Sequence, residues 1–266
     1  MKLYYDFHIH SCLSPCGDEA MLPADIAGMA KLNGLDMVAL TDHNTAKNCP
    51  AFFEACEFYG VTPIAGMELT TAEDVHIVCL FGTLEKAMEF DKFVESRLSP
   101  VKNKAAIFGR QNIVNADGET LGEVENLLIA AAQLDIGQAV EKVRDLGGIC
   151  YPAHIDRDSG GIIAMLGDIP ADYGFNIAEI HDKSRAGEFL NRFPQLKDCT
   201  LLSSSDAHTL LDINQRENYV ELNENSAKCL MESFLLKNKQ KTVEICKTVL
   251  YNQKDNKIAV KTAREV

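Results

Sequence analysis

The stretch D-F-H-I-H, residues 6–10, decides the fold of this chain. It closes an apolar, β-prone run, Leu3–Ile9. Because side chains alternate along a strand, an H-x-H pair places both imidazoles on one face. Histidine is the commonest side-chain ligand for borderline transition metals. We therefore expect His8 and His10 to bind one metal ion at the end of a first strand.

The other five histidines stand in short patterned segments downstream. These segments are T-D-H-N at 41–44, G-M-E-L-T-T at 66–71 followed by His76, Y-P-A-H-I-D-R at 151–157, E-I-H at 179–181, and S-S-S-D-A-H at 203–208. A chain that places all seven histidines in such segments is predicted to build one polynuclear metal site.

The segments fall at the ends of apolar runs, and this placement predicts the architecture. Helical spacing at 23–33, stopping at Gly34, and at 48–59 alternates with buried strands at 35–40, 61–69 and 75–81. The rhythm resumes with a helix at 138–146 and strands at 147–154, 177–180 and 200–203, and a last helix is expected near 226–238. In a parallel α/β barrel the carboxyl ends of the strands meet at one face, where ligands distant in sequence can converge.

The segment from about 84 to 137 breaks this rhythm. Residues 84–98 are predicted to form an amphipathic helix, and Asp117-Gly118 is a hairpin signal within 112–123. We interpret 84–137 as an insertion into a single domain that spans residues 1–266. Two roles stay open: a lid over the substrate, or a surface elaboration without catalytic role.

The composition narrows the class of protein. A hydrophobic fraction of 46% supports one sizeable core in 266 residues. The net charge of −13 makes long nucleic acid an unlikely partner, although bound divalent ions would still attract a small phosphorylated substrate. Nine cysteines without C-x-x-C, no secretory signal and no apolar run of about 20 residues predict a cytoplasmic protein with reduced thiols and no membrane segment. The oligomeric state stays open.

Carboxylates complete the predicted metal site. Glu68 ends a strand, where its two oxygens can bridge two ions. Asp206 and His208 repeat the period-two spacing of the first histidine pair. His43 follows Asp42, which can either orient a ring or cap a helix.

Three further histidines and one arginine extend the site. His76 and His154 lie on apolar segments, and we expect both to be ligands that share Glu68. Arg157 can clamp a phosphate with its planar guanidinium or pair at the surface with Asp156 or Asp158. His181 lacks a second ligand close in sequence, so we expect it to contact substrate or structure rather than metal.

The order of these motifs resembles that of the PHP (polymerase and histidinol phosphatase) family. H-x-H, T-D-H, a strand-ending glutamate, two isolated histidines and S-D-x-H follow one another over residues 3 to about 222. The resemblance implies an α/β fold, a distorted, TIM-like (β/α)7 barrel. It also implies two or three divalent metal ions (manganese, iron or zinc) and hydrolysis of phosphoesters.

The resemblance further implies how the ligands are shared. His8, His10, Glu68 and Asp206 would hold a first metal; Glu68, His76 and His154 a second; and His43 and His208 a third. A residue of the loop after His10 would complete the third site, where family members often carry histidine or aspartate. That loop reads S-C-L-S-P-C-G-D-E at 11–19, with Asp18 and Cys16 as candidates. We prefer Asp18 for a hard or borderline ion.

Together these residues predict a phosphomonoesterase acting on a nucleotide, a sugar phosphate or a compound of the histidinol phosphate type. A hydroxide that bridges two metal ions would attack phosphorus. Asp206, His208 and His43 are the predicted catalytic residues, and Arg157 and His181 the predicted substrate contacts. The alternatives are an exonuclease using the same metals, a C–N hydrolase, and a non-catalytic metal-binding module. A C–N hydrolase would usually carry a bridging carboxylated lysine where this chain has Glu68.

Overall fold

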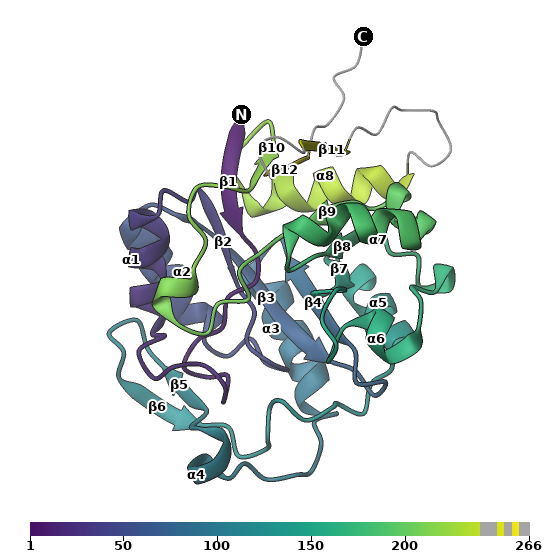
Figure 1. Ribbon diagram of the computed structural model, residues 1–266. Helices are drawn as coiled ribbons and strands as arrows, with labels where there is room; N and C mark the ends of the chain where they lie inside the picture. The colour runs from purple at the N-terminus through teal and green to yellow at the C-terminus, as the bar shows by residue number, and fades with distance from the viewer. Residues whose placement is uncertain (240–248, 253–256, 261–266) are drawn as a thin grey trace.

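A curved sheet forms the centre of the molecule, and helices surround it (Figure 1). The computed structural model describes residues 1–239, 249–252 and 257–260. The main sheet has the strand order β11-β12-β10-β1-β2-β3-β4-β7. Its strands are β1 (Lys2–Asp6), β2 (Met37–Leu40), β3 (Thr62–Thr70), β4 (His76–Phe81), β7 (Ile149–Pro152), β10 (Tyr219–Glu221), β11 (Val249–Asn252) and β12 (Lys257–Val260).

The first three strands follow the predicted βα rhythm. Strands β1, β2 and β3 are parallel, and the connecting helices are α1 (Pro23–Leu32) and α2 (Cys49–Tyr59). Helix α1 ends at Leu32, and Gly34, which follows the C-cap Asn33, has a φ of 75°, the left-handed conformation that glycine adopts at little cost. The predicted elements at 23–33, 35–40, 48–59 and 61–69 are confirmed to within about two residues.

The strand β4 interrupts this rhythm. It follows β3 after a five-residue turn without a helix, and it runs antiparallel to both β3 and β7. The amino end of β4 therefore lies at the same edge as the carboxyl ends of β1, β2 and β3. This reversal brings His76, the first residue of β4, to that edge, and it makes the sheet mixed rather than regularly parallel.

A second, two-stranded sheet continues the curve. Strands β8 (Ile177–Glu179) and β9 (Thr200–Leu202) are parallel to each other. Single backbone hydrogen bonds connect this small sheet to the main one. Ile155 N–H, after β7, donates to Glu179 O of β8 at 2.9 Å, and His10 N–H, after β1, donates to Ala207 O, after β9, at 3.0 Å. The strand ends near residues 10, 155 and 207 thus gather around one region.

Two apolar layers hold the sheet. Alternate residues of β1, β2, β4 and β7, such as Tyr5, Val78 and Tyr151, pack in an inner cluster with Phe234 of helix α8 (Ala227–Lys239). The other faces of these strands pack against the outer helices. Helix α8 crosses the end of the sheet where β1 begins (Figure 1), so the opposite end is left for a site. The remaining helices and turns are α3 (Leu84–Glu95), α4 (Ala105–Phe108), α5 (Ile136–Asp145), α6 (Ile162–Leu166), α7 (Ala186–Arg192), η1 (Ala171–Tyr173), η2 (Lys183–Arg185), η3 (Pro194–Asp198) and η4 (Leu210–Asp212).

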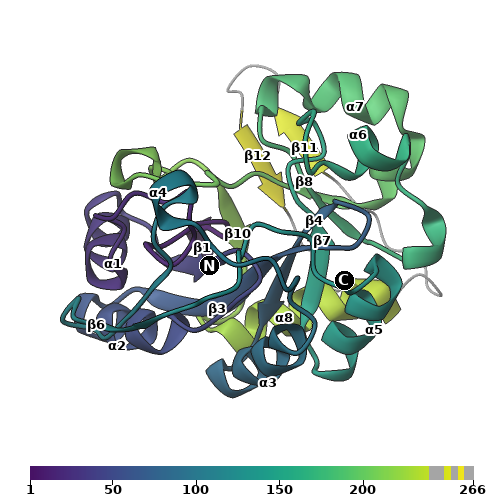
Figure 2. The ribbon, with the colours of Figure 1, turned by 90° about the horizontal axis from the view of Figure 1, so that it is seen from below.

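The segment predicted as an insertion divides into two parts. Helix α3 buries Ala87, Phe90 and Val94 and packs against β3 and β4, so it belongs to the outer helical layer. Residues 96–135 depart from the layer and contain α4 and the hairpin of β5 (Asn112–Val114) and β6 (Thr120–Glu123), which confirms the predicted hairpin. Figure 2 views the molecule from the end at which α4 projects.

This projecting segment is fixed to the rest of the chain by amide side chains. Asn48 donates to Asn112 O at 3.2 Å and accepts from Val114 N–H at 3.0 Å. Gly109 lies so close to the loop after β1 that a Cβ there would collide with the carbonyl oxygen of Pro15. Asn44, from T-D-H-N, donates to Leu128 O at 2.6 Å. The segment therefore borders the loops that follow β1 and β2. The lid role stays a prediction.

The expectations of no membrane segment and of reduced thiols can be compared with the structure over the described residues alone. Across 1–239, 249–252 and 257–260, each helix is too short or too polar to cross a bilayer. Eight cysteines lie in these ranges, and all are free thiols.

Candidate metal centre

The predicted ligands converge at the sheet edge where β1, β2 and β3 end and β4 begins. His8, His10 and Glu68 are almost fully buried, and Asp206 is 7% exposed. Strand β1 ends at Asp6, and the alternation of a strand is not kept beyond it, since Phe7 packs in the inner cluster and Ile9 in the outer one. The histidine pair therefore lies just beyond the strand and not within it.

The proton positions on His8 follow from its partner. Glu179 is buried, and its Oε1 lies 2.9 Å from His8 Nδ1. A carboxylate only accepts hydrogen bonds, so Nδ1 carries a proton, and Nε2 is the atom left to bind a metal ion. The same Oε1 accepts from the backbone N–H of His154 at 3.2 Å. One carboxylate thus orients two predicted ligands.

The proton positions on His10 follow from a longer chain of hydrogen bonds. Ser14 Oγ donates to Asp42 Oδ1 at 2.7 Å and accepts from the backbone N–H of His43 at 3.1 Å. With its single proton committed, this hydroxyl accepts from His10 Nδ1 at 2.9 Å. Asp42 is itself held by the N–H and hydroxyl of Ser11. Of the two roles predicted for Asp42, the structure matches ring orientation.

The Nε2 atoms of His8 and His10 therefore face each other and the carboxylates of Asp206 and Glu68. His8 Nε2 and His10 Nε2 lie 3.2 Å apart, and Asp206 Oδ1 lies 3.2 Å and 3.0 Å from them. Oxygens of Glu68 lie 3.3 Å from each nitrogen. When both rings are neutral, these four groups offer only lone pairs to one another and repel, whereas a cation with nitrogen and oxygen ligands at about 2.0–2.2 Å would be surrounded at such spacings. The donor set therefore fits a divalent transition metal.

The electrostatics show how strongly the pocket favours positive charge. Burial opposes a proton on His10, but hydrogen bonds to Asp206 and Glu68 outweigh it and raise its pKa to about 9. Burial also opposes charge on Glu68, but the surrounding histidines hold the pKa of its carboxyl well below the usual range. Without a metal, protons on histidine supply the charge that an ion would otherwise bring.

Glu68 lies between two groups of nitrogen atoms. Its Oε1 is 3.0 Å from His76 Nδ1 and 3.0 Å from His154 Nε2, whereas its Oε2 is 3.0 Å from His43 Nδ1. Three sets of potential ligand atoms result: His8, His10, Glu68 and Asp206; His43, Glu68 and His76; and His10, His43 and His208. The first set has the predicted membership. In the second, His43 stands where His154 was expected, although His154 also touches Glu68.

The loop after His10 is arranged differently from the expectation. The carboxylate of Asp18 is exposed and accepts from Ala20 N–H at 2.8 Å, so the structure does not bring it into any of the three sets. The turn at 17–20 directs it to its own backbone. Cys16, the other candidate, places its Sγ 3.2 Å from His208 Nε2.

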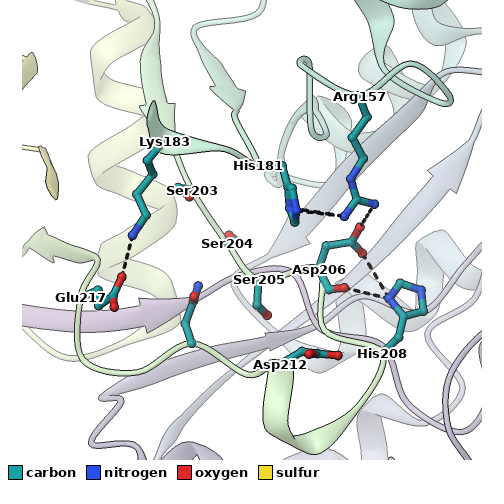
Figure 3. Close-up of a pocket in the computed structure, with 11 residues that line it drawn as sticks. Arg157, His181, Lys183, Ser203, Ser204, Ser205, Asp206, His208, Asp212 and Glu217 are labelled. Carbon is teal, nitrogen blue, oxygen red and sulfur yellow. Dashed lines mark hydrogen bonds and ion pairs between the residues drawn. The ribbon is translucent and has the colours of Figure 1, made fainter. Parts of the chain in front are cut away.

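Arg157 lies beside the cluster (Figure 3). Its Nη1 donates to Asp206 Oδ2 at 2.5 Å, and its Nη2 lies 3.3 Å from His181 Nδ1. The surface pairing with Asp156 that the sequence left open is not formed, because Asp156 accepts from the backbone N–H groups of His181 and Asp182. Arg157 and His181 thus lie together beside the cluster, and their role as substrate contacts stays a prediction.

The backbone is unusual at two of the predicted ligands. His154 has a φ of 26° and Asp206 a φ of 54°, in the left-handed region that side chains rarely adopt. Such strain gathers where a site fixes the geometry of its residues. Gly160 packs against the face of the His76 ring, where a Cβ would lie 2.9 Å from three ring atoms. A larger residue at 160 would push this imidazole away.

Two orienting residues were missed in the sequence. Ser14 looks like an ordinary loop serine, and only its i, i+4 distance from His10 hints at a contact. Glu179 stands two residues before His181 at the end of a predicted strand, the same placement that identified Glu68. That placement was a usable signal.

The chain belongs to the PHP domain family, whose profile matches residues 6–149. This confirms the resemblance and places the protein among metal-dependent hydrolases of phosphate esters. A 5′-3′ exoribonuclease of Haemophilus influenzae is 25% identical over 193 residues, which cover 58% of this chain and 69% of that protein.

Solved structures show the same fold. An Endonuclease Q complex with a 27-mer duplex that carries an abasic lesion aligns with a TM-score of 0.65 at 18% identity, over 92% of this chain and 57% of that one. The chain thus spans just over half the length of this endonuclease. An amidohydrolase from Chromobacterium violaceum with bound sulfate aligns with a TM-score of 0.55 at 17% identity, over 86% of this chain and 96% of that one. These likenesses establish the mixed α/β fold with a curved sheet.

Proposed function

We propose that this protein hydrolyses the phosphate ester of a nucleotide or a related small sugar compound at a centre of two or three divalent metal ions. The observation that carries the proposal is the convergence of ligand atoms from His8, His10, Glu68 and Asp206 at one buried point. Divalent ions in such a site supply positive charge for phosphoryl oxygens and lower the pKa of water. Manganese, iron and zinc all suit this donor set.

The ligands divide into three positions in this proposal. His8, His10, Glu68 and Asp206 would hold one ion. Glu68 with His76, His154 and His43 would hold a second. His43 and His208, with Cys16 rather than Asp18, would hold a third. The strands β1, β2, β3, β4, β7, β8 and β9 would form the seven-stranded barrel, with residues 1–266 as one domain.

The remaining residues act on the substrate. Arg157 is 37% exposed and can turn from Asp206 toward a phosphate, which it would clamp through two N–H groups. Asp206, His208 and His43 remain the proposed catalytic residues. Where the third position holds no ion, His208 is better placed than His43 to give a proton to the leaving oxygen, because its side chain is 29% exposed against 8% for His43.

The test is phosphate release by manganese-loaded protein. The substrates are nucleoside monophosphates, sugar phosphates, histidinol phosphate and 3′,5′-bisphosphates, with the metal content measured on the same sample. Fast release from one monoester, lost in Asp206→Asn, supports the proposal. Absence of turnover on the panel despite two or three bound ions would overturn it in favour of a C–N hydrolase or a non-catalytic module.

A second candidate is the stepwise shortening of oligonucleotides at the same centre. The likeness to an exoribonuclease over 193 residues and to an endonuclease bound to duplex DNA favours it. The net charge of −13 opposes long nucleic acid as a partner but allows short strands. Short 5′-phosphorylated RNA and DNA strands in the same assay separate the candidates, because an exonuclease releases mononucleotides rather than inorganic phosphate.

A further inference from the structure

A polar pocket of about 500 Å³ opens beside the metal centre (Figure 3). Asp206 and His208 belong to both the pocket and the predicted ligands, so an ester whose phosphate lies on the centre can extend directly into this space. The volume is within the range of sites for small molecules. The pocket is lined by Arg157, His181, Lys183, Ser203, Ser204, Ser205, Asp206, His208, Asp212, Asn214 and Glu217.

The lining selects a polar ligand. Each of the eleven side chains carries a hydroxyl, amide, carboxylate, imidazole or cationic group. A pocket for an apolar leaving group would be lined mainly by aliphatic and aromatic side chains. The part of the substrate that enters this space therefore makes hydrogen bonds rather than apolar contacts.

The charges distinguish hydroxyl groups from a second phosphate. Both cations of the pocket already have carboxylate partners: Arg157 pairs with Asp206, and Lys183 Nζ lies 2.8 Å from Glu217 Oε2. Two further carboxylates of the lining, those of Asp212 and Glu217, are exposed, and Asp212 Oδ2 accepts from Thr209 Oγ1 at 2.8 Å. Carboxylates there repel an anion and accept hydrogen bonds from hydroxyls.

We propose that this pocket binds the sugar that carries the phosphate, and that Asp212 and Glu217 accept hydrogen bonds from its hydroxyl groups. The inference rests on the proposed phosphoesterase function and narrows its substrate class to esters of ribose or a similar polyhydroxylated sugar. A protein that hydrogen-bonds the 2′-hydroxyl distinguishes ribonucleotides from deoxyribonucleotides. The same preference holds for a monoester and for the terminal residue of a short RNA.

The experiment compares substrates that differ by one hydroxyl group. Hydrolysis of matched ribonucleoside and 2′-deoxyribonucleoside 5′-monophosphates is measured with manganese-loaded protein, and p-nitrophenyl phosphate serves as an ester without sugar hydroxyls. Since a hydrogen bond to a charged acceptor contributes on the order of tenfold in binding, we expect kcat/KM to be about tenfold higher for the ribonucleotide. In Asp212→Asn or Glu217→Gln this ratio falls toward one, mainly through KM.

Two controls make the result interpretable. Glu224→Gln removes an exposed carboxylate outside the pocket and should retain the wild-type ratio. Calorimetric titration of the nucleosides themselves measures binding without turnover, and the ribonucleoside should bind more tightly than its deoxy counterpart.

The outcomes separate the two proposals. Hydrolysis of p-nitrophenyl phosphate with equal use of ribo- and deoxyribonucleotides in wild type and variants would overturn the sugar pocket and leave the phosphoesterase standing. Absence of hydrolysis of every ester would overturn the phosphoesterase. In that case, calorimetric preference for the ribonucleoside that is lost in Asp212→Asn would still support the pocket.

Discussion

Replacement of Glu179 by glutamine should weaken metal binding without removing any ligand. Oε1 of Glu179 accepts from His8 Nδ1 at 2.9 Å and from His154 N–H at 3.2 Å, and the residue is 1% exposed. Glutamine keeps the shape and one acceptor but loses the negative charge that makes His8 a stronger ligand. Loss of such an orienting partner typically lowers metal affinity by about 10- to 100-fold, which is about 1.4–2.8 kcal/mol.

The same substitution should also lower the stability of the metal-free protein. Oε2 of Glu179 is buried and makes no hydrogen bond among the described residues, so glutamine would bury an unpaired NH2 group there. An unpaired buried donor costs about 1–3 kcal/mol. In a protein of this size each kcal/mol lowers Tm by about 2–4 °C. We expect a Tm lower by several degrees.

The assay is competition between the protein and a chelator of known affinity. Glu188→Gln is the matched control, since Glu188 is exposed and pairs only with Arg185 at the surface. Its metal affinity and Tm should equal those of the wild type. A metal Kd within twofold of wild type in Glu179→Gln would refute the orienting role of Glu179.

Three other predictions concern the ligands and their protonation. Asp206→Asn and His8→Ala should reduce phosphate release at least 100-fold while circular dichroism stays native; near-normal turnover in either would contradict the proposed site. Ser14→Ala leaves the His43 N–H and His10 Nδ1 without this acceptor, so we expect metal affinity about 10-fold lower and stability about 1–3 kcal/mol lower by denaturant titration. The raised pKa of His10, about 9, stabilises the metal-free fold below pH 6.5, and this stability is lost as pH rises through 9. Because metal binding displaces that proton, the gain in Tm on adding manganese should grow between pH 6.5 and 9, and a gain that shrinks over this range would oppose the assignment.

The local elements and most of the side chains that converge at the candidate site could be predicted from sequence because they depend on short-range patterns. Alternation of apolar runs with helical spacing located β1, β2 and β3, and the polar residues that end these runs were the converging ones. Gly34 follows the end of α1 and adopts the left-handed backbone conformation that glycine favours, as the sequence predicted. The positions of His8, Glu68 and Asp206 followed from this logic alone.

The features that the sequence did not specify depend on contacts between distant residues. The contact from His8 to Glu179 joins positions 171 residues apart, so the strand-end placement of Glu179 does not reveal which ring it meets. The reversal of β4 depends on how the turn at 71–75 pairs its strand with β3, and it decides which end of the strand presents His76. Asp18 was preferred for its chemistry, but the turn that it forms with Ala20 directs its carboxylate away from the cluster.

The most direct test of the proposed function is phosphate-ester hydrolysis measured as a function of bound metal per chain. Protein stripped with a chelator is reloaded with manganese in steps, and elemental analysis and turnover are recorded on each sample. The proposed metal-dependent phosphoesterase should bind two or three ions per chain at saturation, and its activity should rise with the number of ions bound. Glu68→Gln should show neither this metal binding nor this activity. Full activity in the stripped protein, or saturation below one ion per chain, would contradict the proposed function.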